Sequence, residues 1–225
     1  MVTRARPRRP PVEKPGLTRD RVVQAALDLV DARGLEELTM RSLGEALSVE
    51  AMSLYRYFPS KADLLAGIAD RVLGEIEYPA PTTGWRRNLE EGGVSFWRAL
   101  VAHPNAVPLL FMTPSDTPGS RAAVESALRT LARAGFAPGE AHQVFRIFQA
   151  FVFGSALMYS ARAPADVVRK TVAALNADGQ YPLLRAALSE APTIDHQADF
   201  RLGLARLLDG IEATRRPAKP ARRRR

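Results

Sequence analysis

The stretch AMSLYRYFPSKA, residues 51–62, combines aromatic and basic side chains and contains no acid. Four bulky residues follow one another in it, and neighbouring residues of a helix point about 100° apart, so they cannot all face one core. Arginine can form two parallel hydrogen bonds with guanine, while tyrosine hydroxyls and lysine bind phosphates. The stretch is therefore a candidate surface for contact with DNA.

The alternative is that these aromatic residues form the core of a small helical domain. Leu54 and Phe58 are four residues apart and share one helix face, so they fit a core. A core role does not explain an outward aromatic and basic cluster without acids, and this pattern favours DNA contact. The residues left on the outer and flanking faces are Met52, Ser53, Tyr55, Arg56 and Tyr57.

The residues before this stretch predict two helices that would position it. Thr18 and Gly34 are residue types that begin and end helices, and apolar residues recur between them every three or four positions. Thr39 caps a shorter helix, and residues 48–50 interrupt the pattern before a second short helix, 51–57. Two short helices joined by a three-residue turn are typical of a helix-turn-helix module, whose second helix enters the major groove.

A longer helix is expected to connect this module to the rest of the chain. Pro59 ends the short helix, because the residue before a proline is disfavoured in the helical region. Ser60 and Asp63 have the spacing of a capping box, which begins a helix over 60–77. Residues 17–77 are thus predicted to form a DNA-binding domain, called the head below. The buried face of its last helix would consist of Leu64, Leu65, Ile68, Val72 and Ile76.

The remainder of the chain predicts a second helical domain, so the expected fold class is all-α. The segment YPAPTTG has the composition of a linker, and no strand alternation follows it, so the domain border falls near residues 77–84. The second domain, 78–213, is expected to bind a ligand and to dimerise. Its predicted helices are 85–102, broken by His103 and Pro104, then a short apolar piece at 105–112, then 120–134, 139–161 and a last helix over 195–213.

The segment HQVFRIFQAFVFGSALMY, residues 142–159, is apolar on almost every side. It is shorter than the ~20 residues of a membrane-spanning helix and contains Arg146 and Gln149, so we expect a buried helix and no membrane partner. A helix that is apolar all round must be covered all round. Together with the last helix it is expected to pair with the same two helices of a second chain in a homodimer; a monomeric bundle core is the alternative.

The positive charge of this 225-residue chain is concentrated at its two ends. The net charge is +8, with +5 over residues 1–19 and +7 over residues 213–225, which leaves the body mildly acidic. Both ends are rich in proline and poor in large apolar residues, which predicts disordered basic arms at 1–16 and 214–225. Such arms raise solubility, or they add salt-sensitive affinity for DNA.

Several classes of site lack the residues that they need. The absence of cysteine excludes disulfides, thiolate nucleophiles and cysteine-based metal sites. His103, His142 and His196 lie far apart, without metal-site spacing and without neighbours that would form a catalytic triad. We therefore expect no cofactor and no metal. Prolines stand where a signal peptide would have its apolar stretch, which predicts a cytoplasmic protein.

The head resembles the DNA-binding domain of the tetracycline repressor (TetR) family, through the helix over 18–34 and the motifs TMRSLGEAL and SLYRYFPSKADLL. The segments FWRALVAHP, LRTLARAGFAPGEAHQVFRIFQAFVFGSAL and DFRLGLARLLDGIEA resemble the C-terminal domain of the tetracycline repressor's own subgroup. The resemblance covers nearly the whole chain between the arms. It implies a homodimer that binds a double-stranded DNA operator and a small-molecule effector.

The resemblance assigns roles to individual residues of the head. Arg41 would read a guanine, and Tyr55, Tyr57 and Lys61 would hold phosphates. Two positions depart from the tetracycline repressor, because Ala51 replaces a base-reading glutamine and Arg56 replaces a tryptophan, so a different operator is expected. Ser48 stands in the turn where the family often has glycine. The expected DNA-binding residues are Arg41, Ala51, Met52, Ser53, Tyr55, Arg56, Tyr57 and Lys61, with Met52 and Ser53 at base edges.

The resemblance also places an effector pocket in the second domain, with different polar groups. The drug-binding asparagine of the tetracycline repressor aligns with Gly92, and its two drug- and metal-binding histidines align with Glu77 and Leu110. A metal-chelated tetracycline would lose its anchors, so we expect a more apolar effector without a metal. The candidate pocket residues are Phe96, Leu100, His103, Leu110, Met112, Phe145, Phe148 and Gln149, each of which would also fit plain core packing.

The expected function is that of a ligand-responsive transcriptional repressor that binds a palindromic operator. One alternative is a regulator that activates transcription or has no small-molecule effector. Another is an enzyme that uses the apolar pocket and carries the head as a helical appendage, although no catalytic arrangement supports it. A third is a DNA-compacting protein whose binding depends on the basic arms alone.

Overall fold

The computed structural model describes residues 16–79, 84–112, 117–160, 167, 169–171, 173–174, 180–190 and 195–215. Every regular element in these residues is a helix, which confirms the all-α prediction. The predicted basic arms fall almost entirely on residues 1–15 and 216–225, outside the described residues. The elements are α1 (Arg19–Arg33), α2 (Met40–Leu47), α3 (Ala51–Leu54), α4 (Lys61–Leu73), α5 (Trp85–Ala102), η1 (Pro104–Ala106), α6 (Val107–Met112), α7 (Pro118–Arg133), α8 (Pro138–Ser160), α10 (Pro182–Glu190) and α11 (His196–Thr214).

The helices of the head begin at the caps that the sequence predicts. The Thr18 hydroxyl oxygen accepts a hydrogen bond from the Arg21 N–H, and the Ser60 hydroxyl oxygen accepts one from the Asp63 N–H. At Thr39 a capping box forms with Ser42, a partner that the sequence pattern did not identify. These bonds satisfy N–H groups that have no partner inside the helix, and so they fix where each helix starts.

The turn between α2 and α3 brings the two short helices close together. Ser48 has φ 56° and ψ 43°, the left-handed conformation that glycine adopts most easily, so serine costs up to about 1 kcal/mol here. Gly44 lies at the crossing, since a Cβ atom on it would stand 2.9 Å from the Val49 carbonyl oxygen. A larger residue at position 44 would push α3 away from α2.

Two helices of the head end earlier than predicted. α3 stops at Leu54 rather than at residue 57, because the Tyr57 and Phe58 N–H groups both donate to the Leu54 carbonyl oxygen and close a turn. α4 stops at Leu73 rather than at residue 77, and Gly74 follows it. Ile76 nevertheless stays buried beyond the helix end, as the apolar pattern predicted.

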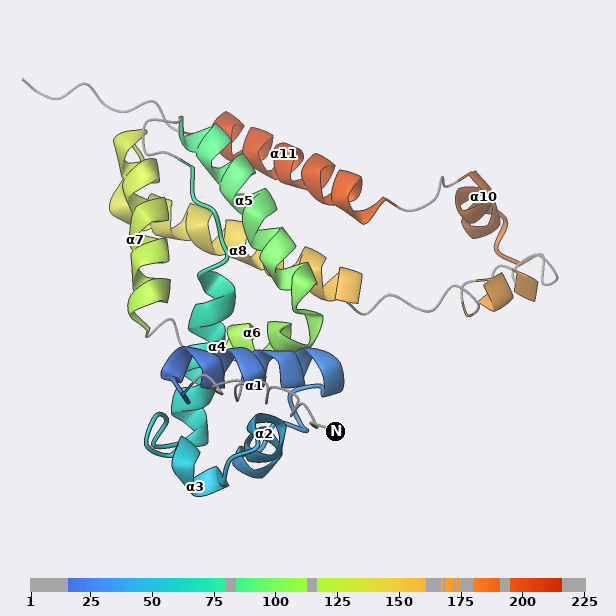
Figure 1. Cartoon of the computed structure of the whole chain (residues 1–225). Coiled ribbons are helices and arrows are strands. Elements are labelled where there is room, and N and C mark those ends of the chain that lie inside the picture. Colours follow the sequence, from blue (N-terminus) through green and yellow to red (C-terminus); the bar gives the residue numbers. More distant parts are fainter. Residues whose placement is uncertain are drawn as a thin grey trace, which may run out of the picture.

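The second domain is arranged around α5, which contacts α7, α8 and α11. Figure 1 shows α1 to α3 at one end of the molecule and these four helices at the other, with α4 running from the head toward them. α7 begins at Pro118, two residues before the predicted start, with Thr117 as its N-cap. α10 is a helix that the sequence pattern did not predict, and its Leu183 and Leu184 are exposed.

Candidate nucleic-acid interface and internal cavity

The surface of α3 and its following turn stands on a fully buried base. Leu54 and Phe58 have no exposed area, whereas Met52 is 73% exposed and Tyr55 is 41% exposed. A Cβ atom on Gly67 of α4 would lie 3.1 Å from the Phe58 ring, so the ring packs tightly against α4. The split between a buried and an outward face agrees with the sequence prediction, and it holds the outward side chains on a rigid support.

The other side chains predicted to contact DNA lie around this surface. Arg41 is 88% exposed on α2, and its Nε atom donates to Glu45 Oε1 at 3.0 Å. Such exposed pairs one helical turn apart contribute only a few tenths of a kcal/mol, so Arg41 can exchange this partner for a base at little cost. Lys61 is exposed in the first turn of α4, and Ala51 and Ser53 are half-buried in α3.

Tyr57 has a role within the head that the sequence did not indicate. Its hydroxyl donates to the Leu17 carbonyl oxygen at 2.6 Å, and its own carbonyl oxygen accepts from Arg19 at 3.1 Å. The Arg19 guanidinium also lies 4.3 Å from the centre of the Phe58 ring. Tyr57 therefore ties the start of α1 to the turn after α3, and a phosphate contact would require its hydroxyl to give up Leu17. The Arg56 guanidinium is exposed and lies 6.0 Å from the Tyr57 ring.

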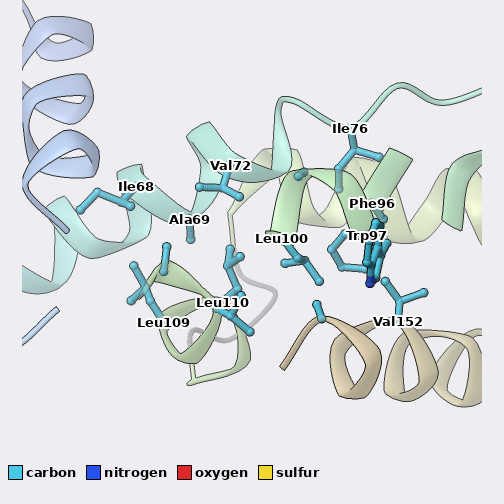
Figure 2. Close-up of a cluster of buried hydrophobic side chains, with 14 of the residues drawn as sticks. Ile68, Ala69, Val72, Ile76, Phe96, Trp97, Leu100, Leu109, Leu110 and Val152 are labelled. Atoms are coloured by element: carbon cyan, nitrogen blue, oxygen red, sulfur yellow. The ribbon is translucent and has the colours of Figure 1, made fainter. Parts of the chain in front are cut away.

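A cavity of about 420 Å³ lies where α4, α5, α7 and α8 meet. This volume is within the usual range of small-molecule sites. Figure 2 shows Ala69 and Ile76 from the α4 side of the cluster, together with Phe96 of α5 and Leu110 of α6. The described lining residues are Ala69, Leu73, Ile76, Tyr78, Asn88, Leu89, Gly92, Phe96, Leu110, Thr117, Ser120, Ala123, Val124, Ser126, Ala127, Phe145, Arg146, Phe148, Gln149, Ala150 and Phe153.

The predicted pocket residues divide between this cavity and other places. Leu100 of α5 is not among the residues that line the cavity, and its side chain is fully buried in the core. His103 does not line it either, because it binds two carboxylates at the head. The side chain of Met112 lies outside the described residues. The five that line the cavity are Phe96, Leu110, Phe145, Phe148 and Gln149.

The cavity also contains polar groups that the sequence pattern missed. Asn88 and Arg146 line it, and neither side chain was distinguished from an ordinary surface residue by spacing alone. Tyr78 lines it from the segment after α4, and burial raises the pKa of its phenol. The sequence feature that could have indicated a polar cavity residue is the position of Arg146, which stands three residues before Gln149 on a helix that is otherwise apolar on every side.

His103 connects the second domain to the head. Its Nδ1 atom is 2.7 Å from Asp31 Oδ2 of α1, and its Nε2 atom is 3.1 Å from Glu75 Oε2 after α4. The Asn105 amide adds a hydrogen bond to the Asp31 carbonyl oxygen at 3.0 Å. Burial lowers the pKa of His103, but the hydrogen bonds and charges of Asp31 and Glu75 outweigh burial and leave this pKa raised. The imidazolium form is therefore the one that holds the two parts together.

Replacing His103 with glutamine is expected to change stability in a pH-dependent way. A raised pKa means that the stabilisation is complete below the ordinary histidine pKa of about 6.5 and is lost as pH rises through the raised value. In urea unfolding, the free energy of unfolding of the wild-type protein should exceed that of His103→Gln by on the order of 1 kcal/mol at pH 6 and by much less at pH 9. His142→Gln, an exposed histidine of α8, is the control. An equal gap at both pH values would contradict the ion-pair role.

Two further classes of site are absent from the part of the chain that the structure describes. No cluster of three histidine, aspartate or glutamate side chains there is arranged to hold a metal ion. No described helix is long and apolar enough to span a bilayer.

Comparisons with known proteins match both parts of the chain. Residues 22–68 match the family described as bacterial regulatory proteins, tetR family, and residues 78–215 match the tetracyclin repressor-like C-terminal domain. The HTH-type transcriptional repressor DrrR1 of Streptomyces coeruleorubidus is 36% identical, over 93% of this chain and 82% of that protein.

Solved structures agree with these matches. A possible TetR family transcriptional regulator from Streptomyces coelicolor A3(2) superimposes with a TM-score of 0.75 at 32% identity, covering 88% of this chain and 100% of that chain. Streptomyces coelicolor ActR in complex with actinorhodin gives a TM-score of 0.75 at 28% identity, covering 88% of this chain and 98% of that chain. Both the head and the second domain are therefore similar to one type of regulator.

Proposed function

Because this chain belongs to the tetracycline repressor (TetR) family of bacterial regulatory proteins, we propose that it is a ligand-responsive transcriptional repressor. It binds a palindromic operator in double-stranded DNA as a homodimer, and a small, largely apolar effector in the cavity releases it. The cytoplasm, where bacterial operators lie, is its place of action.

The observation that carries this proposal is the outward surface of residues 51–62, a stretch that contains no acid. Met52 and Tyr55 are exposed above the buried pair Leu54 and Phe58, and Arg41 and Lys61 flank them. A group of exposed apolar and aromatic side chains with polar residues at its edge is typical of a surface that binds a partner. Side chains that can read bases lie beside side chains that can hold phosphates, which is the division of roles in a DNA interface.

A second copy of the chain would cover the outer faces of α8 and α11. These two helices pack on each other through the stacked rings of Phe151 and Phe200, 5.5 Å apart. Away from that contact Leu157, Met158 and Leu202 remain about half exposed or more. Two such helices from each chain form a four-helix interface, and the twofold axis places two heads about 34 Å apart, one turn of DNA.

The helix α4 is the connection between effector and operator. Leu64 and Ile68 of α4 are fully buried in the core, while Ala69 and Leu73 line the cavity. An effector that fits the cavity better in one position of α4 shifts the population toward that position and changes the spacing of the two heads. ActR bound to actinorhodin is a relative in which a small molecule occupies such a regulator.

A catalytic role is less well supported than a regulatory one. The described lining of the cavity contains two serines and one threonine but no histidine, lysine, aspartate or glutamate that could act as a general base. The proposal therefore assigns the cavity to binding alone.

Selection of binding sites from random DNA duplexes tests the proposal directly. The purified protein should enrich one palindrome whose half-sites are centred one helical turn apart. A shortened chain without residues 1–16 and 214–225 should select the same palindrome with lower affinity and a weaker dependence on salt, because the arms contribute only phosphate contacts. Enrichment of no sequence, or loss of all preference in the shortened chain, would overturn the proposal.

A further inference from the structure

The cavity contains one formally charged side chain among its described lining residues, Arg146 of α8. None of the residues that the structure describes forms an ion pair or hydrogen bond with its guanidinium, whereas the guanidiniums of Arg86 and Arg129 in the same domain are paired with carboxylates. Arg146 is exposed at the edge of the cavity, so an anion bound among the lining residues can reach its guanidinium while the guanidinium stays in contact with water.

Two amides accompany this arginine. Gln149 lies three residues after Arg146 on α8, so the two share a helix face, and Asn88 lines the cavity from α5. Neither amide makes a side-chain hydrogen bond to another described residue. Each amide has two N–H donors, and the oxygens of a ligand carboxylate could accept hydrogen bonds from them. The polar part of the cavity is therefore rich in donors that lack acceptors.

The rest of the cavity suits a flat aromatic molecule. Phe96 and Phe153 meet edge to face with ring centres 5.2 Å apart, and Phe145 and Phe148 lie nearly parallel with ring centres 6.4 Å apart. All four rings line the same cavity of about 420 Å³. Aromatic rings pack favourably on other rings in both arrangements, so these side chains favour fused rings over a flexible chain.

We propose that the effector is an aromatic carboxylate, whose fused rings lie among the four phenylalanines and whose carboxylate pairs with Arg146. The proposal rests on the function assigned above, because it names the chemistry of the effector that the regulator senses. A cationic aromatic molecule would be repelled by Arg146. A neutral one would leave the donors of Arg146, Asn88 and Gln149 without charged acceptors, so it should bind less tightly.

The test uses matched pairs of acids and amides. Naphthalene-2-carboxylate and anthraquinone-2-carboxylate are each compared with the corresponding carboxamide, which has the same rings but no charge. Isothermal titration calorimetry at pH 7.5, with the full-length protein and no DNA, gives the dissociation constants. At least one acid should bind about two- to fivefold more tightly than its amide, the effect of one ion pair with an arginine that is exposed to water.

Three variants separate this pair from a general effect of charge. Arg146→Gln should bind the acid and the amide equally well, and Arg146→Lys should recover part of the preference because it keeps the charge but not the two-pronged geometry. Arg129→Gln removes an arginine that pairs with Glu125 on the surface of α7, and it should keep the full preference. Circular dichroism checks that each variant is folded.

The proposal is overturned if no acid binds more tightly than its amide, or if Arg146→Gln keeps the preference of the wild-type protein. Because the calorimetry contains no DNA, these results are independent of operator binding. A protein that selects a palindrome but shows no acid preference would refute the effector class alone. A protein that prefers the acids but selects no palindrome would refute the regulatory function alone.

Discussion

A Leu157→Glu protein is expected to be monomeric and to lose about a thousandfold or more in operator affinity. Leu157 is 53% exposed on α8, beside Met158 at 76%, on the face proposed to meet the partner chain. A carboxylate buried in a twofold interface faces either the same carboxylate of the partner chain or the partner's apolar side chains. Either arrangement reduces the free energy of dimerisation by several kcal/mol. A single head makes half of the contacts, so its affinity falls toward that of non-specific binding, which is typically 10³-fold or more weaker.

Light scattering coupled to gel filtration measures the mass of this variant, and fluorescence anisotropy with the selected operator measures its affinity. The matched control is Ala132→Glu, which adds the same charge to an exposed position of α7. The control should remain dimeric and bind the operator normally. A dimeric Leu157→Glu protein with full affinity would mean that the chains associate through a different face.

The head was predictable because local chemistry decides it. Thr18, Thr39 and Ser60 are caps whose hydroxyl oxygens accept from the N–H group three residues ahead, and these bonds are present in the structure. The apolar spacing likewise assigned Leu54 and Phe58 to the core correctly. Both signals depend only on residues a few positions apart, so no knowledge of the tertiary fold was needed.

The helix ends were less predictable because competing hydrogen bonds set them. The Leu54 carbonyl oxygen accepts from both the Tyr57 and the Phe58 N–H groups, and this choice ends α3 three residues early. No residue type in the stretch specifies that choice, apart from Pro59, which disfavours a helical Phe58. α10 was not predicted for a different reason. Its Leu183 and Leu184 are exposed, so the apolar residues of this helix do not follow the helical spacing of a buried face.

The cavity could be predicted only on the side where it coincides with the core. Phe96, Phe145 and Phe148 are apolar residues at helical spacing, and such residues face inward whether or not a cavity is present. His103 shows a limit of the sequence pattern, because an isolated histidine in an apolar context resembles a pocket residue, yet it is not among the residues that line the cavity. Its actual partners, Asp31 and Glu75, lie 72 and 28 positions away in sequence, and spacing carries no information about them.

An Arg41→Ala protein is expected to fold normally and to bind the selected operator about 10- to 100-fold more weakly. Arg41 is 88% exposed, and its one described partner is Glu45 on the same helix, so its removal costs the head little stability. A two-pronged contact with guanine contributes about 1–3 kcal/mol of discrimination against other bases. The affinity should therefore fall, and the preference at one base pair in each half-site should disappear.

The way in which the loss of affinity depends on the DNA sequence distinguishes a base contact from a phosphate contact. Lys61→Ala should weaken binding to all sequences equally and reduce the salt dependence, by about one counterion per head, because a phosphate contact carries no base preference. Arg33→Ala, an exposed arginine at the far end of α1, is the control and should bind as the wild-type protein does. If Arg41→Ala and Tyr55→Ala both keep full affinity, the surface around α3 is not the one that meets DNA. A uniform loss in Arg41→Ala would instead make Arg41 a phosphate contact, since only a base contact changes the ranking of operators.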